Sequence, residues 1–229
     1  MTGGAAVNAE ALDSIHYLKE GNWAAYFDGG EDDYVYMSFT DQRLLNTALY
    51  LEMFQEAAAE IQSHPDCDKL VIDLRLHPGG YDALLDDFRE FVQLLKASSI
   101  EHTYVLTDGY TTSCATYLIC MFQNELNAVT VGEPTGQFTS GYGFTMAVLG
   151  HPQFVLPHSQ INVFVPDYEF HVNDWAEENG YAKLTEEAYD ENGCLYEWEN
   201  TVLPDVFVYQ DIEDIRQGKD SVIEWVLVQ

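Results

Sequence analysis

The sequence predicts an α/β protein with a largely parallel sheet and helices packed against it. Short apolar runs rich in β-branched and aromatic residues alternate with longer segments whose apolar residues recur at helical spacing. The 229 residues are 47% hydrophobic, which is enough to fill a core. The order strand, helix, strand, helix, strand, helix, strand is typical of βαβ units on a parallel sheet.

The first elements come from residues 33–95. Residues 33–40 (DYVYMSFT) are rich in aromatic and β-branched residues and predict a strand. Residues 45–61 carry apolar side chains at helical spacing and predict an amphipathic helix. Residues 69–75 (KLVIDLR) form an almost continuous apolar run, as in a strand buried on both faces. The turn HPGG follows, and residues 84–95 predict a second helix.

The next elements repeat this alternation and then leave it. Residues 102–108 predict a strand, 112–126 a helix and 127–133 a strand. After Glu133 three short β segments (FTMAVLG, QFVLP and INVFV) predict hairpins. The acidic stretch 172–200 predicts a surface excursion with one short helix, and the chain closes with a strand (VFVY) and a helix from Ser221.

Composition limits the partners of the chain. Nine basic against 39 acidic residues give a net charge of −30, so nucleic acid and anionic membrane surfaces are excluded as partners. No apolar run is long enough for a membrane span. The four cysteines show no metal-ligand spacing, so we predict no metal, no cofactor and no disulfide framework. Residues 1–30 are expected to be a lead-in, truncated or not, and residues 31–229 one core domain.

Two turns carry the residues that chemistry would need. RLHPGG follows the strand at 69–75 and TDGYTTSCA the strand at 102–108, and ligands bind beyond the carboxyl ends of such strands. Gly79 and Gly80 lead into a helix, so their N–H groups can face an anion, and the N–H of Cys114 would point the same way. With Ser113 between them, this predicts a nucleophile with an oxyanion hole. The alternative is a plain glycine turn and a serine that caps a helix.

Five segments resemble, in order, the motifs of one serine peptidase family. KLVIDLRLHPGG resembles hhIDLRxNxGG, TTSCATYL resembles TxSxAE, and VGEPTGQ resembles GExTxG. FVLPHSQINVFVP resembles LPxSGhxhxhP, and LPDVFVYQDIEDIRQGKDSVIEWVL resembles the closing element of the same family. The family is that of the tail-specific (C-terminal-processing) proteases and the tricorn core. The resemblance implies a ClpP/crotonase-like core, a peptide or protein substrate and an extracytoplasmic or secreted setting.

The resemblance assigns roles position by position. It implies that Ser113 is the nucleophile and that Gly79 or Gly80, with Cys114, supplies the oxyanion-hole N–H groups. His77 stands where the motif has Asn, and Thr116 stands where it has Glu. The segment after GEPTG holds no lysine, so a Ser/Lys dyad is excluded.

The general base is left open between three alternatives. The tricorn-like branch uses an upstream His and a late Glu before a PD element; here Glu197 and Glu199 flank the aligned position, and Glu199 is the predicted orienting residue. Upstream, His16 lacks the motif. Either the base lies before this chain, or another histidine such as His171 or His77 serves, or the chain is not catalytic.

Two functions follow from these residues. The first is a serine peptidase core that hydrolyses peptide bonds through Ser113. The second is a non-catalytic module that binds a peptide or a small ligand on the same fold, as some relatives in this family do. Ser113 and the glycine turn favour the first, whereas the missing lysine and the unmatched histidine favour the second. The sequence predicts no particular oligomeric state.

Overall fold

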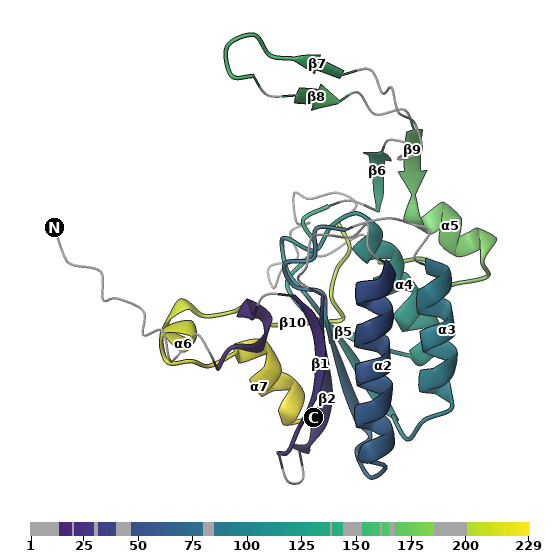
Figure 1. The fold of residues 1–229 in the computed structure, drawn as a ribbon, viewed down its shortest axis with the longest axis vertical. Helices are drawn as coiled ribbons and strands as arrows, with labels where there is room; N and C mark the ends of the chain where they lie inside the picture. Colours follow the sequence, from purple (N-terminus) through teal and green to yellow (C-terminus); the bar gives the residue numbers. More distant parts are fainter. Residues whose placement is uncertain are drawn as a thin grey trace, which may run out of the picture.

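A mixed sheet with helices on both faces forms the body of the protein (Figure 1). The computed structural model describes residues 14–19, 21–29, 32–39, 47–79, 85–137, 139–143, 153–160, 162–164, 168–185 and 201–229. Within these residues the main sheet has six strands in the order β1-β2-β3-β4-β5-β10. Four consecutive pairs, from β2 to β10, are parallel, and β1 joins the edge antiparallel to β2.

The parallel strands are those that the sequence pattern predicts, with shorter bounds. They are β2 (Tyr34–Phe39), β3 (Lys69–Asp73), β4 (His102–Thr107), β5 (Val129–Gly132) and β10 (Val206–Phe207). The predicted parallel neighbours β3, β4 and β5 are confirmed by their registers, for example Val71 beside Tyr104. Arg75 and Asp108 lie beyond the ends of their strands, in the turns that follow.

The pattern did not predict strand β1 (Asn22–Phe27), which pairs with β2 along its whole length. Every residue of β1 is half-buried, so its sequence NWAAYF shows no alternation of apolar and polar side chains. Beside it, the short 3-10 helix η1 (His16–Leu18) packs Tyr17 into the protein. Residues 22–27, which the sequence places in a lead-in, are thus part of the sheet.

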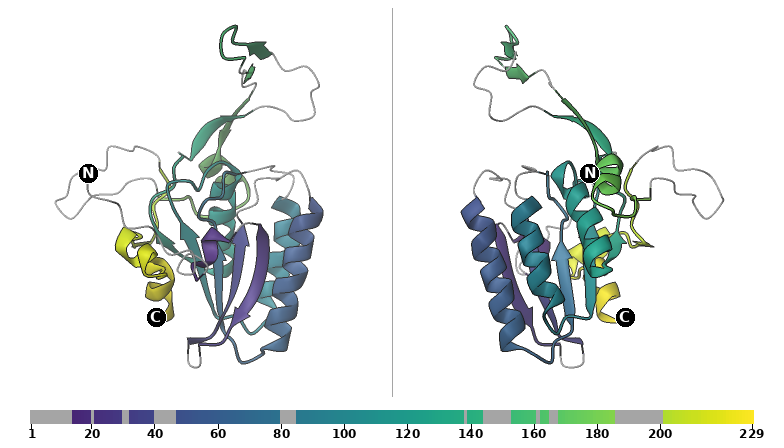
Figure 2. Two further views of the ribbon diagram at one scale, coloured as in Figure 1. Left: turned by 60° about the vertical axis from the view of Figure 1, so that its left-hand side comes forward. Right: turned by 90° about the vertical axis from the view of Figure 1, so that its right-hand side faces the viewer.

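Three long helices cover one face of the sheet and two short ones lie on the other (Figures 1 and 2). The long helices are α2 (Thr47–Ser63), α3 (Leu85–Lys96) and α4 (Cys114–Leu126), and the short ones are α6 (Ile212–Arg216) and α7 (Ser221–Leu227). Alternate residues of β2 therefore face two cores. Val35 and Met37 pack toward the long helices, and Tyr36 packs toward α7.

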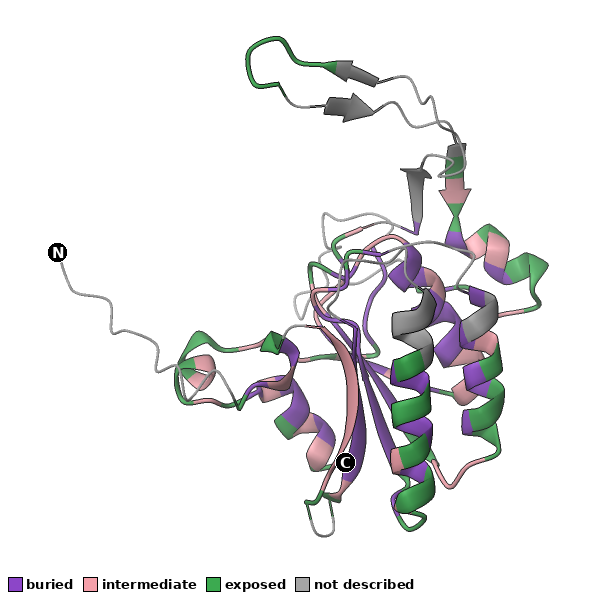
Figure 3. Ribbon diagram, in the orientation of Figure 1, coloured by how far each residue is buried: buried purple, intermediate pink, exposed green. Residues whose placement is uncertain are grey.

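Burial of both faces explains why the central strands read as continuous apolar runs. Every residue of β2 and β3 is buried, while the outer sides of the helices are exposed (Figure 3). The larger core contains an aromatic cluster in which the rings of Phe54 and Phe91 stack with centroids 4.4 Å apart. Burial on this scale stabilises each such ring by about 1.5–3 kcal/mol.

Short antiparallel pairs extend from the carboxyl edge of the sheet (Figures 1 and 2). Strand β6 (Ser140–Gly143) pairs with β9 (Tyr168–His171), and β7 (Gln153–Val155) pairs with β8 (Asn162–Phe164). The β7–β8 pair agrees with the predicted hairpin, whereas segments 144–150 and 186–200 lie outside the described residues. The acidic stretch begins with the expected short helix, α5 (Val172–Glu178). Among the described helices, none combines the length and the apolar character that crossing a membrane requires.

Candidate active site

The two turns that the sequence singles out lie against each other at the carboxyl edge of the sheet. The Leu76 N–H donates to both carboxylate oxygens of Asp108, at 3.2 Å each. The Thr112 N–H donates to the carbonyl oxygen of His77 at 3.0 Å. The Thr111 hydroxyl donates to the Leu74 carbonyl oxygen at 2.9 Å. The turn after β3 is thus bonded directly to the turn that leads into α4.

Ser113 has a backbone conformation that side chains with a Cβ rarely adopt. Its φ is 56° and its ψ is −125°, and α4 begins at the next residue. Such strain costs about 1–3 kcal/mol and persists only where the surroundings impose it. The serine side chain makes no capping hydrogen bond to the helix, which argues against the simple capping role. Ser113 is half-buried, and no described residue forms a hydrogen bond with its Oγ.

Gln137 is one of the groups that hold Ser113 in place. Its side-chain Oε1 accepts a hydrogen bond from the Ser113 N–H at 2.7 Å. The Gln137 carbonyl oxygen accepts one from the Thr135 hydroxyl at 2.9 Å. Sequence reasoning missed Gln137, although a signal was present: it occupies the last position of VGEPTGQ, where the resembled motif GExTxG has glycine.

Gly79 packs directly on the serine. Its φ is 89°, and a Cβ added there would lie 2.2 Å from the Ser113 Cβ and 2.9 Å from its Oγ. Only glycine therefore fits at this position. The Gly79 N–H does not face an open space, because it donates to Nδ1 of His77 at 3.0 Å. Of the predicted oxyanion donors, Gly79 is thus bonded within its own turn, Cys114 is the first residue of α4, and Gly80 lies outside the described residues.

His77 is inside the protein, next to the core. It is 3% exposed, and its ring centroid lies 6.1 Å from that of Phe39. Because Nδ1 accepts a hydrogen bond, the proton of the neutral ring belongs on Nε2, which is buried without a partner. Burial lowers the pKa of His77 to about 4, so the ring is neutral at physiological pH.

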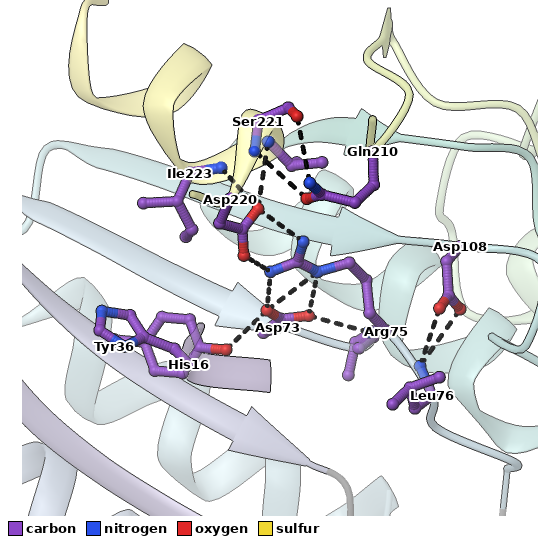
Figure 4. A network of polar contacts seen from close by, with 12 residues as sticks. His16, Tyr36, Asp73, Arg75, Leu76, Asp108, Gln210, Asp220, Ser221 and Ile223 are labelled. Carbon is purple, nitrogen blue, oxygen red and sulfur yellow. Dashed lines mark hydrogen bonds and ion pairs between the residues drawn. The ribbon is translucent and has the colours of Figure 1, made fainter. Parts of the chain in front are cut away.

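A second polar network begins at the same strand end and extends to the opposite face (Figure 4). Arg75 donates through Nε and Nη2 to Asp73 and through Nη1 and Nη2 to Asp220, at distances of 2.5–3.1 Å. The Tyr36 hydroxyl donates to Asp73 at 2.6 Å. Asp220 also caps α7 by accepting from the N–H groups of Val222 and Ile223.

The network ties the end of the chain to the centre of the sheet. Burial tends to raise the pKa of Asp220, but the charge and hydrogen bonds of Arg75 and the helix N–H groups lower it overall. Asp73 and Arg75 belong to the motif IDLR, and Asp220 belongs to the closing motif 145 positions later. These motif residues therefore form an ion cluster that joins the N-terminus of α7 to the end of β3.

Of the other candidate residues, the two that the structure describes, His171 and His16, form no hydrogen bond with Ser113. His171 is half-exposed and lies 3.6 Å from Glu169, measured from Nε2 to Oε1. His16 is on the α7 side, where its Nε2 lies 3.0 Å from the Tyr34 hydroxyl and burial lowers its pKa. Glu197 and the predicted orienting residue Glu199 lie outside the described residues.

A cavity of about 320 Å³ opens beside the turn, on the side of α6 and α7. Its walls come from the segments that follow β3, β4, β5 and β10, and they include Arg75, Asp108 and Glu133. Ser113 does not line it. Asp108, which the sequence analysis did not select, holds the turn by accepting from the N–H groups of Tyr110 and Thr111 as well as Leu76.

One cluster of the described residues has the composition of a metal site, and it lies at the other end of the strands. Side-chain ligand atoms of Asp68, Glu101 and His102 are all within 4.8 Å of one another. All three residues are exposed and stand at the amino ends of β3 and β4, away from the Ser113 turn. The described cysteines Cys67, Cys114 and Cys120 are buried, and they form no disulfide with one another.

Comparison with known proteins gives matches in structure only. No family model matches the sequence, and no curated protein matches it. The fold is similar to that of a candidate S41 protease from Bacteroides fragilis, with a TM-score of 0.51 and 15% identity. That match covers 89% of this chain and 56% of the other.

Two further solved structures are similar to a lesser degree. A candidate peptidase from Parabacteroides merdae has a TM-score of 0.48 and 18% identity, over 96% of this chain and 69% of that one. The photosystem II D1 C-terminal processing protease has a TM-score of 0.36 and 16% identity, over 83% of this chain and 47% of that one. The fold of this chain is thus similar to that of a candidate S41 protease, and the chain spans about half the length of two of these three proteins.

Proposed function

We propose that this chain is the core of a serine-type peptidase in which Ser113 is the nucleophile. One observation carries the proposal: Ser113 has φ 56° and ψ −125° at the start of α4, with its Oγ against the Gly79 turn. Strained residues of this kind cluster at active sites, and a strained turn between strand and helix exposes a nucleophilic serine in other hydrolases. The peptidase-like fold supports the proposal.

The chemistry would be acyl transfer. The Ser113 Oγ bonds to the carbonyl carbon of a peptide while its proton passes to a base, and backbone N–H groups stabilise the oxyanion. Collapse of the intermediate breaks the C–N bond, the leaving amine takes the proton, and water then hydrolyses the ester. Cys114 and Gly80 are the proposed donors, since the Gly79 N–H is bonded to His77.

The catalytic set also needs a base that takes the proton of Ser113. Within the chain we propose His171, with Glu199 as the carboxylate that orients it, although no hydrogen bond joins His171 to Ser113 in this structure. The proposal extends to a ClpP/crotonase-like core that includes strand β1 as well as residues 31–229, to peptide or protein substrates and to an extracytoplasmic setting. All of these rest on the family resemblance.

A second candidate function is a non-catalytic module that binds a peptide or a small ligand. The observation that favours it is the hydroxyl of Ser113, which has no hydrogen-bonded base among the described residues. A serine hydroxyl without a base is a poor nucleophile at neutral pH. On this alternative the strained turn would shape a binding surface and would form no covalent bond.

Reaction with a fluorophosphonate probe separates the two functions. The peptidase proposal expects slow, stoichiometric labelling at Ser113, located by mass spectrometry and abolished in Ser113→Ala. Ser99→Ala, which changes a surface serine bonded to the Cys67 carbonyl, is the matched control and should label normally.

Two results would contradict the peptidase proposal. One is the absence of any labelling at Ser113 in a cooperatively folded protein. The other is labelling that persists unchanged in Ser113→Ala, since the probe would then be reacting elsewhere. Saturable binding of peptides without labelling would favour the binding module.

A further inference from the structure

His77 forms two hydrogen bonds with the backbone next to Ser113. Its Nδ1 accepts from the Gly79 N–H at 3.0 Å, and its carbonyl oxygen accepts from the Thr112 N–H at 3.0 Å. The first contact fixes the glycine that packs on the serine. The second fixes the residue immediately before the serine. One residue thus bonds to both backbone segments that enclose the Ser113 side chain.

The side-chain contact has the geometry of a local turn lock. A side-chain acceptor on residue i that bonds the N–H of residue i+2 is the pattern by which Asn and Asp stabilise turns. Here a histidine takes that part. This hydrogen bond stabilises Gly79 in a left-handed backbone conformation, with a φ of 89°. Gly79 packs so closely on Ser113 that a Cβ added to it would clash with the serine side chain.

The burial of the ring shows that its place is determined by more than packing. Nε2 is buried and has no partner, so the protein keeps a polar N–H inside at a cost that a hydrocarbon side chain would avoid. An unsatisfied buried polar atom in a native structure calls for a compensating role. The only side-chain hydrogen bond of His77 among the described residues is the one to Gly79.

We propose that His77 is a positioning residue for the nucleophile, and that its neutral imidazole holds the Gly79 turn against Ser113. This inference rests on the proposed function, in which Ser113 reacts. His77 touches neither substrate nor reacting atoms in this role; it acts through the two backbone segments. The ring must be neutral, since a proton on Nδ1 would remove the acceptor. Burial favours that state, and no charged side chain among the described residues contributes to it.

The test compares two substitutions that both remove the imidazole. His77→Asn keeps an acceptor that can bond to the N–H two residues on, whereas His77→Leu keeps apolar volume and loses the acceptor. With the fluorophosphonate probe we expect His77→Leu to label Ser113 about tenfold more slowly than the wild type, the effect of one lost hydrogen bond. We expect His77→Asn to stay within about threefold of the wild type. His64→Leu, at the other end of the sheet, is the control and should label normally.

The outcome that overturns the inference is equal labelling of His77→Leu and His77→Asn, or faster labelling of His77→Leu than of the wild type. The latter would mean that the imidazole obstructs an oxyanion donor. Unfolding melts of both variants show whether a slower rate is a loss of fold. Because Asn is smaller and more polar than Leu, a merely structural role of His77 predicts that Asn is the worse replacement.

A second measurement tests the His77–Gly79 hydrogen bond without any reaction at Ser113. It can therefore be made even if the probe does not label the wild type and the proposed function fails. Nitrogen-15 NMR of the wild type should show His77 as the tautomer protonated at Nε2, and hydrogen exchange should show a protected Gly79 amide. Protection should fall in His77→Leu and be retained in His77→Asn. The opposite tautomer, or unchanged protection in both variants, would overturn the inference by itself.

Discussion

The chain that leaves strand β3 contributes to two regions, which differ in the pairing of their polar groups and in backbone strain. On the α7 side, Arg75 donates hydrogen bonds to the carboxylates of both Asp73 and Asp220 (Figure 4). On the α4 side, four residues after Arg75, Gly79 packs on the strained residue Ser113. Nε2 of the buried His77, in the same turn as Gly79, has no hydrogen-bond partner among the described residues. In the first region the buried polar groups form hydrogen bonds. The second region combines a strained backbone at Ser113 with a buried nitrogen that has no partner among the described residues.

This difference separates the structural role of the ion cluster from the role that we propose for the Ser113 turn. A buried ion cluster that is complete fixes one arrangement of the chain, and here it anchors the last helix to the central strand. Strain and unsatisfied groups persist only where the surroundings impose them, and they gather at reactive sites. Residues of one motif, IDLRLHPGG, divide between these two tasks.

The largest expected effect comes from breaking the ion cluster. Asp220→Ala leaves the buried charge of Arg75 with half of its partners, and we expect it to lower the free energy of unfolding by about 3–5 kcal/mol. Denaturant unfolding followed by circular dichroism measures the change. The matched control is Asp211→Ala, which removes the exposed cap of α6 and should cost about 1 kcal/mol. A similar loss in both variants would mean that Asp220 matters only as a cap.

An intermediate effect is expected from acid titration of His77. Its pKa is about 4 in the folded protein and about 6.5 in the unfolded chain, so its contribution is fully present above pH 6.5. Between pH 6.5 and 4 only the unfolded chain takes up the proton, so the free energy of unfolding decreases as the pH is lowered. At about 1.4 kcal/mol per pKa unit, the loss attributable to His77 is about 3 kcal/mol.

The measurement is the difference in unfolding free energy between the wild type and His77→Leu over this pH range. His16, whose pKa burial also lowers, is present in both proteins and cancels. The wild type should lose more stability on acidification than the variant. Parallel pH curves for the two proteins would show that His77 is not a buried neutral base.

The smallest effect concerns the strain at Ser113. Glycine tolerates φ 56° and ψ −125° without a Cβ penalty, so Ser113→Gly should be about 1 kcal/mol more stable than Ser113→Ala. At Ser98, whose φ is not positive, the order should reverse by up to about 1 kcal/mol, because glycine gains more entropy on unfolding. Alanine more stable than glycine at both positions would mean that the serine is not strained.

Much of the fold could be read from local patterns. Runs such as KLVID and HTYVLT are mostly apolar or β-branched and show no alternation, because both faces of a central strand are covered, and the helices between them impose parallel pairing. Strand β1 could not be predicted in this way. It is an edge strand whose residues are all half-buried, so its sequence shows no alternation of apolar and polar residues. The two turns could be placed beside each other for the same topological reason, since both follow neighbouring parallel strands.

The sequence by itself determined which segments become strands and helices and which turns meet at the carboxyl edge, because periodicity and turn chemistry act over a few residues. Only the tertiary structure decided how the polar groups pair. Arg75 and Asp220 are 145 positions apart, and Gln137 reaches the Ser113 N–H across 24 positions. The inward direction of the His77 ring likewise depends on the packing around it. Such contacts are set by the joint packing of distant segments, which no local pattern records.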